Sequence, residues 1–465
     1  MTSKKLGFWS IVFLAINSIV GSGIFLTPGV VITMVGKLGP LAYIAAALLA
    51  ACLAVTFAVA AKYVTKSGSA YAYAKAAFGS RFGFYMGTVR YFSAAVAWGV
   101  MAVSVIKSTL SIFGGDTNNF WLVTACFIIL MTIITLINFG GEPLFAFINN
   151  LATIGKVAAL ALLIIAGTVL VIKSGHSNAA TLAHLTDGHN HALIPPVTTS
   201  TFVMAVATSF YAFTGFESVA SGSADMEAPE KNLPRAIPLA IILIALVYIG
   251  TITVAIMVNP QAIVTTKQVV ALAAIFTNPW LRNLILTGAL ISMFGINIAA
   301  SFNTPRILEA MATEGQVPQW LAHRNHRDFP ARAYLITVVL ALIIPMAFNY
   351  SVPAIILLSA MVRFFEFAVI PLAVIMFYYG KAQEPLLPAP RNWWTDVVIP
   401  ALGMVVTILL LIKYDWVGEF TLNGAINWYA IGGMIVGFIL LPLAFAWFAR
   451  HDHLSQAWDY LVQWY

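Results

Sequence analysis

Two glycine-containing stretches interrupt long runs of apolar residues, and each would free backbone groups that can bind a charged ligand. The first contains Gly21, Ser22 and Gly23, and the second surrounds Gly215. Inside a bilayer, unpaired N–H and C=O groups are tolerated only where they are buried in protein or face a cavity. One break by itself is more typical of a close crossing between helices. Two breaks together favour a binding site.

The chemistry of the freed groups matches a zwitterion. The N–H groups of Ser22 and Gly23 would begin a helix, whose positive end favours a carboxylate. Carbonyl groups near Ile19, Tyr211 and Thr214 would accept hydrogen bonds from an ammonium group. We therefore predict a substrate site formed by Ile19, Gly21, Ser22, Gly23, Tyr211, Thr214 and Gly215.

Three charged residues within apolar runs are candidates for coupling or gating, because charges inside a membrane are costly and usually functional. Lys156 is either a proton switch, since burial favours the neutral form of a lysine, or a permanently charged tether. Glu217 follows the second break and either forms a proton-linked gate or binds freed backbone groups. Arg90 either faces the substrate or pairs with Glu217 or Glu366.

Two further pairs of opposite charge are spaced three residues apart: Arg306 with Glu309, and Arg363 with Glu366. This spacing allows an ion pair along one helix. We interpret both pairs as charge neutralisation within the fold or as an inner gate, in preference to substrate contacts.

These residues lie in segments that are predicted to be membrane helices. Of the 465 residues, 61% are apolar and only 9% are charged, whereas about 25% are charged in typical soluble domains. This composition excludes a soluble enzyme and a nucleic-acid-binding protein. The chain is predicted to form one transmembrane domain, residues 1–465, in which twelve segments are long enough to cross a bilayer. They lie near residues 8–33, 40–62, 82–113, 121–139, 144–173, 199–224, 236–258, 282–311, 333–349, 353–379, 396–413 and 427–449.

An even number of crossings places both termini on one side of the membrane. Most of the 24 lysines and arginines then lie in the loops and tails of that side, which predicts cytoplasmic termini in a plasma-membrane protein. The two breaks open the first and sixth segments, so they favour two inverted repeats, residues 8–173 and 199–379, with peripheral helices at 396–449.

Four stretches in this order resemble amino acid permeases of the amino acid, polyamine and organocation superfamily: residues 21–25, 213–217, 227–238 and 306–318. The resemblance implies an all-α, leucine-transporter-like fold with broken helices one and six and alternating access. It implies that the substrate carboxylate binds at Ser22 and Gly23 and the amine at carbonyls of both broken helices. It also implies that the Lys156 ammonium takes the place of a sodium ion used by sodium-coupled relatives.

These observations together predict a secondary transporter of small neutral L-amino acids, coupled to protons or working by exchange. Similar permeases carry an aromatic residue in place of Arg90, so the first alternative is an acidic amino acid transporter or an amino acid/amine antiporter of the same fold. A small residue near Ala300 replaces the tryptophan of arginine and agmatine exchangers, which disfavours cationic substrates. The alternative from another class is an amino acid sensor that does not transport.

The expected partners are the amino acid substrate, membrane lipid and, in the coupled case, protons. The sequence holds no phosphate-binding loop, nucleophile elbow or metal-binding quartet. We therefore expect no enzymatic activity, cofactor, metal or nucleic-acid partner, and a monomer or a homodimer.

Overall fold

A computed structural model describes residues 5–186, 192–265, 271–348, 350, 352–413, 416–422 and 424–450. The outermost parts of the predicted 1–465 domain, residues 1–4 and 451–465, lie outside these ranges. The helices of the first half are α1 (Phe8–Ile19), α2 (Gly23–Val35), η1 (Gly36–Leu38), α3 (Gly39–Tyr63), α4 (Ala70–Phe78), α5 (Ser80–Ile112), α6 (Phe120–Phe139), α7 (Glu142–Ser174) and η2 (Asn178–His184).

The second half begins with α8, the helix before the second break, and ends in a short hairpin followed by the C-terminal helices. Its larger helices are α8 (Thr199–Tyr211), η3 (Phe216–Asp225), α9 (Pro229–Val258), α12 (Pro279–Thr313), α13 (Ala331–Ala347), α14 (Val352–Tyr378), α15 (Ile399–Lys413), α17 (Trp428–Ile435) and α18 (Leu441–Arg450). Shorter elements are α10 (Pro260–Thr265), α11 (Ala271–Ala274), η4 (Gln319–Ala322), η5 (Trp394–Val398), α16 (Trp416–Glu419), η6 (Val436–Leu440) and the antiparallel strands β1 (Thr421–Leu422) and β2 (Ala425–Ile426).

The all-α membrane architecture is confirmed. Within the described ranges, nine helical segments are long and apolar enough to cross a membrane, and three shorter apolar helices accompany them: Phe8–Ile19, Ala331–Ala347 and Ile431–Trp447. One of the nine, Thr27–Tyr63, runs from α2 through η1 to the end of α3. The short helix α4 was not expected, because its alanines and tyrosines do not form a run of membrane length.

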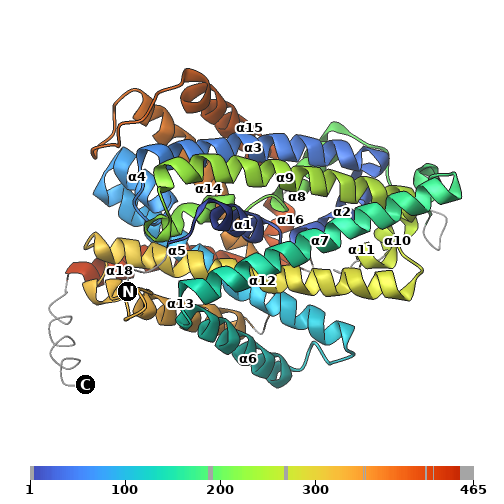
Figure 1. Cartoon of the computed structure of the whole chain (residues 1–465), viewed down its shortest axis with the longest axis horizontal. Helices are drawn as coiled ribbons and strands as arrows, with labels where there is room; N and C mark the ends of the chain where they lie inside the picture. Colours follow the sequence, from blue (N-terminus) through green and yellow to red (C-terminus); the bar gives the residue numbers. More distant parts are fainter. Residues whose placement is uncertain are drawn as a thin grey trace.

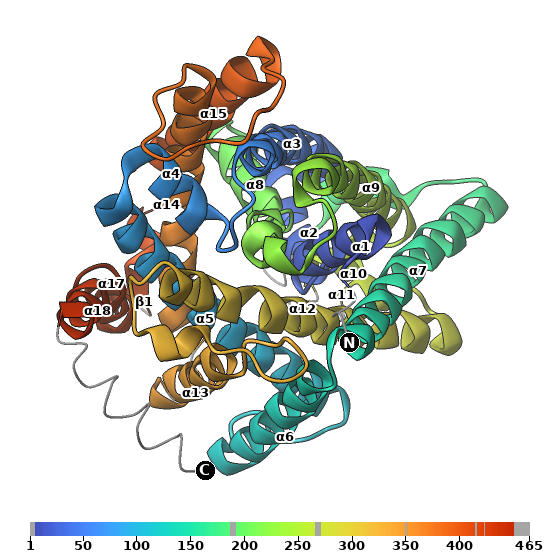
Figure 2. The same cartoon turned by 60° about the vertical axis from the view of Figure 1, so that its left-hand side comes forward.

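The helices fall into two groups that face each other across the molecule. Most lie along its long axis (Figure 1). Helices α1, α2, α3, α8 and α9 pack together, while α12 packs against α5 and α7, and α13 against α5 and α6. Figure 2 shows these two groups, with α14 beside α5 and the helices α15, α17 and α18 at the periphery.

Burial distinguishes central helices from those that face lipid. Each of these helices contains an apolar stretch of 18 residues that could cross the bilayer. In α5, 83% of this stretch is buried, whereas the buried share is 28% in each of α6, α7 and α15. These three helices expose large apolar side chains such as Trp121, Leu136, Ile154 and Ile412. Apolar side chains on an outer face are stable in a bilayer, so α5 is the central helix and α6, α7 and α15 form the lipid-facing boundary.

Both predicted breaks are present. Helix α1 ends at Ile19, Val20 is extended with φ −77° and ψ 95°, and α2 begins at Gly23. Helix α8 ends at Tyr211, and a turn leads through Gly215, whose φ is +123°, into η3. A positive φ is accessible to glycine without steric cost. Gly215 therefore explains the turn at the second break, whereas Gly21 and Gly23 at the first break are not among the residues with positive φ.

Candidate binding site at the two broken helices

The two breaks pack backbone against backbone. A Cβ atom on Gly23 would lie 2.9 Å from the Ala212 Cα atom, and one on Gly215 would lie 2.1 Å from the Ser18 carbonyl oxygen. Both distances are shorter than side-chain contacts allow. Glycine at these two positions is thus what lets the broken segments meet.

A pocket opens beside this junction. All of the predicted substrate residues except Gly21 line it. Gly21 instead packs against α12, where a Cβ atom would lie 2.3 Å from the Ile296 Cδ1 atom. The remaining wall comes from three other helices and includes Arg90, Ala94, Ala97 and Met101 of α5, Ile296, Ala300 and Asn303 of α12, and Arg363 of α14.

Two kinds of backbone group lie at the junction: N–H groups without a partner in their own helix, and carbonyl groups that already accept hydrogen bonds. Ser22 and Gly23 stand at the start of α2, where the first N–H groups of a helix lack an intrahelical partner. The Tyr211 carbonyl, expected to be free, accepts hydrogen bonds from the Thr214 N–H (3.3 Å) and hydroxyl (2.8 Å). The Ala212 carbonyl accepts one from the Tyr248 hydroxyl (3.2 Å). The α2 end therefore suits an anionic group such as a carboxylate.

Lys156 lies behind the first break and does not line the pocket. Its side chain is fully buried in α7. The ammonium group donates to the Val20 carbonyl and contacts the carbonyls of Ser292 (3.3 Å) and Asn17 (3.4 Å). It therefore connects three helices, α7, α1 and α12, through backbone oxygens of the kind that also bind a small cation.

Three buried charged residues, Arg90, Glu217 and Glu366, and the partly buried Arg363 meet beside the pocket. Arg90 Nε lies 3.1 Å from a Glu366 carboxylate oxygen, and Arg363 Nε lies 3.1 Å from Glu217 Oε1. Arg90 Nη2 lies 3.7 Å from the same Glu217 oxygen and donates to the Ser218 hydroxyl at 2.6 Å. The two closest ion pairs thus join different helices, and the Arg363–Glu366 pair that the spacing allowed is not among the ion pairs of the described residues.

Glu217 also binds the second break directly. Its second carboxylate oxygen accepts a hydrogen bond from the Gly215 N–H at 2.7 Å. Of the two roles expected for Glu217, the structure contains this backbone contact. Arg363, whose Nη1 donates to the Thr214 hydroxyl at 3.0 Å, was not predicted to line the site. Its position within an apolar run was the available signal.

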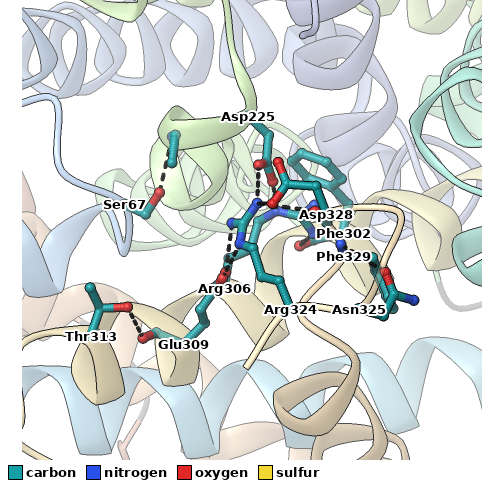
Figure 3. A network of polar contacts seen from close by, with 11 residues as sticks. Ser67, Asp225, Phe302, Arg306, Glu309, Thr313, Arg324, Asn325, Asp328 and Phe329 are labelled. Atoms are coloured by element: carbon teal, nitrogen blue, oxygen red, sulfur yellow. Dashed lines mark hydrogen bonds and ion pairs between the residues drawn. The ribbon is translucent and has the colours of Figure 1, made fainter. Parts of the chain in front are cut away.

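A second ionic network lies at the far end of η3 (Figure 3). Arg306 Nε binds Asp225 at 2.6 Å, and Arg324 binds Asp225 at 2.7 Å and Glu309 at 2.5 Å. The Arg306–Glu309 pair that the spacing allowed is not among the ion pairs of the described residues. Each residue turns to a partner outside α12, because Asp225 and Arg324 lie on segments that pack against the end of this helix.

Comparison with known proteins places the chain in a family. The family model for amino acid permeases matches residues 6–441. An uncharacterized transporter of Mycobacterium tuberculosis is 37% identical over 449 residues, covering 94% of this chain and 93% of the relative. The branched-chain amino acid permease BcaP of Bacillus subtilis is 24% identical over 97% of this chain and 95% of its own. The serine/threonine exchanger SteT of Bacillus subtilis is 26% identical over 74% of this chain and 77% of its own.

Proposed function

Because the chain belongs to the amino acid permease family of the amino acid, polyamine and organocation superfamily, we propose that it is a secondary active transporter of small neutral L-amino acids. It works by alternating access and is either coupled to protons or an exchanger. At the family level it is a multi-pass membrane permease and not an enzyme, since its relatives are named as permeases and transporters.

The observation that carries this proposal is the pocket at the junction of the two breaks. The start of α2 offers N–H groups to the α-carboxylate, and Ala94, Ala97 and Ala300 leave room for a small side chain. Two relatives are named for branched-chain amino acids and for serine and threonine, all of which are neutral. A neutral amino acid therefore agrees with the pocket and with these two relatives, whereas a third relative, of Arabidopsis thaliana, is named as a cationic amino acid transporter.

We further propose the twelve-crossing arrangement with two inverted repeats, residues 8–173 and 199–379, and peripheral helices at 396–449. The α1/α2 break and the α8/η3 break support it, because they open these two ranges at equivalent places. The bias of basic residues supports cytoplasmic termini in the plasma membrane. Labelling of single cysteines at Asp116 and Arg391 by an impermeant reagent tests this orientation: intact cells should label the first and not the second.

Lys156 is the proposed coupling residue, with Glu217 and Arg90 as gating residues. The fully buried Lys156 ammonium contacts the carbonyls of Asn17 and Val20 at the α1 end of the first break, so losing its proton would weaken the hold of α7 on α1. Protons would then be the coupling ion. An exchanger would use the same contact as a permanent tether, which a pH gradient would leave unaffected.

The first experiment is a thermal-shift screen of the purified protein against the amino acids and simple amines. A ligand at about 100 times its dissociation constant stabilises the folded state by about 2.7 kcal/mol, so binders should raise the melting temperature clearly. Proteoliposome flux with the best binder follows. Saturable flux supports a transporter, whereas binding without flux would replace it with a sensor.

An acidic substrate is the second candidate, because both Arg90 and Arg363 line the pocket. A second substrate carboxylate could reach them. The same guanidinium groups disfavour the amine antiporter, since like charges repel across a site of low polarity. Glutamate and aspartate are therefore the decisive ligands in the screen.

A further inference from the structure

The four charges beside the pocket balance one another. Arg90 and Arg363 contribute two positive charges, which Glu217 and Glu366 balance when both carboxyl groups are ionised. The side chains of Glu217 and Glu366 are fully buried, and those of Arg90 and Arg363 are 2% and 16% exposed. Water cannot screen such a group effectively, so its charge balance must come from the protein or from the substrate.

The two signs are arranged in layers around the pocket. Both arginines are lining residues, whereas Glu217 and Glu366 are not. Helix α5 supplies Arg90, α14 supplies Arg363 and Glu366, and η3 supplies Glu217. Each guanidinium carries five N–H donors, and hydroxyl groups next to the second break, Ser218 and Thr214, hold one donor of each. The substrate thus meets guanidinium groups whose positive charge is balanced by carboxylates that do not line the pocket.

We propose that this cluster of Arg90, Glu217, Arg363 and Glu366 determines the charge of the substrate side chain. The inference rests on the proposed transport of amino acids and adds the residues that set its selectivity. With the cluster balanced, a neutral side chain leaves the pocket neutral. A carboxylate side chain would add an uncompensated negative charge near two buried carboxylates, and a cationic side chain would face two guanidinium groups.

Glu366 is the residue at which this balance can be changed with least disturbance. Glu366 forms an ion pair with Arg90, whereas Glu217 also binds the Gly215 N–H and thereby supports the second break. Glu366→Gln keeps the size of the side chain and removes one negative charge. The pocket then carries a net positive charge, which a substrate carboxylate neutralises.

The experiment measures inhibition of neutral amino acid uptake in proteoliposomes by glutamate, with thermal shifts as the binding readout. In wild type, glutamate should not compete. In Glu366→Gln, the inhibition constant of glutamate should fall by about tenfold or more, as expected for a new buried charge pair. The double variant Arg90→Gln with Glu366→Gln restores the balance and should again exclude glutamate, as should the charge-conserving variant Glu366→Asp.

The outcomes separate this inference from the proposed function. Wild type that moves no amino acid would contradict the transporter itself. Wild type that moves neutral amino acids, with a folded Glu366→Gln variant that still ignores glutamate, would overturn only the role of the cluster. If Glu366→Gln does not fold, the double variant decides, because competition by glutamate in that balanced variant contradicts the inference. Competition by glutamate in wild type contradicts it as well.

Discussion

Gly23 is the residue on which the proposed carboxylate site depends most directly. A side chain there would collide with the Ala212 backbone, since even a Cβ atom would approach its Cα atom to 2.9 Å. We expect Gly23→Val to reduce uptake to background while folded protein remains in the membrane, because overpacking costs about 1–3 kcal/mol. Uptake in cells and size-exclusion chromatography of the solubilised protein measure the two effects.

Gly433→Ala is the matched control for this change. Gly433 lies in α17, and a Cβ atom there would meet no atom within 4 Å. Its uptake should equal that of wild type. Saturable uptake at wild-type affinity by Gly23→Val would refute the proposed site.

Lys156 tests the coupling proposal. If its ammonium loses a proton during the cycle, Lys156→Ala should no longer accumulate substrate in response to an inward pH gradient. Substrate binding should survive, because Lys156 does not line the pocket. Flux with and without the gradient, together with thermal shifts, measures both properties. A variant that still accumulates substrate in response to pH would show that the lysine is only a tether.

At the scale of elements, the end of η3 is held by two different attachments. The Leu6 N–H donates to the Asp225 carbonyl and the Glu227 N–H to the Leu6 carbonyl, both at 2.9 Å, which joins the segment before α1 to η3. The Asp225 carboxylate binds Arg306 of α12 and Arg324 (Figure 3). Asp225 therefore attaches both the start of α1 and the end of η3 to α12, which belongs to the opposite group of helices.

Asp225→Asn should release this end of η3. The change removes the charge that two arginines share, so local opening becomes easier and amide hydrogen exchange in residues 216–226 accelerates. A loss of about 1.4 kcal/mol in opening free energy corresponds to about tenfold faster exchange. Hydrogen-exchange mass spectrometry of the solubilised protein measures it.

Asp328→Asn provides the comparison, because Asp328 contacts the same Arg324 at 3.4 Å but is 55% exposed. Exposed ion pairs contribute little to stability, so this variant should exchange like wild type. Equal exchange in the two variants would show that the network does not hold η3 in place.

In the whole molecule, one ionic cluster connects three segments distant in sequence: residues 66–75, the end of α12 and the loop after α14. Lys66 lies 2.9 Å from Glu314 and 3.2 Å from Glu384, and Lys75 lies 2.9 Å from Glu384 and also binds Glu314. Burial by itself would raise the pKa of the Glu314 carboxyl, but the hydrogen bonds and charges of Lys75 and Lys66 outweigh it and lower this pKa. The cluster therefore stabilises the fold when Glu314 is ionised.

The sign of the pH dependence follows from the lowered pKa. The contribution of Glu314 is complete above its unfolded pKa, about 4.3, and is lost as the pH falls through the lower folded pKa. Glu314→Gln should lower the melting temperature at pH 7, by about 1 kcal/mol or less in stability since the pair is partly exposed. Its melting temperature should also fall less between pH 5 and pH 3. Asp116→Asn in an exposed loop should change neither value.

Much of the site was predictable because helix breaks are local in sequence. The breaks at Gly21–Gly23 and Gly215 follow from glycine in apolar runs, and the pairing of Arg90 with Glu366 or Glu217 was one of two expected outcomes. The pocket role of Arg363 was missed. An arginine in an apolar run predicts a partner, but which face of α14 meets the pocket depends on the packing of helices far apart in the chain.

Composition and local pattern were enough to predict a membrane protein with an all-α architecture and the positions of its two helix breaks. Each depends on neighbouring residues, since the length of an apolar run and the backbone freedom of glycine are local properties. Only the tertiary structure decided that Arg306 binds Asp225, that Arg363 binds Glu217 and that Gly21 faces Ile296. Several partners lie within reach of a long charged side chain, and the choice among them is made by the helix faces that packing brings together.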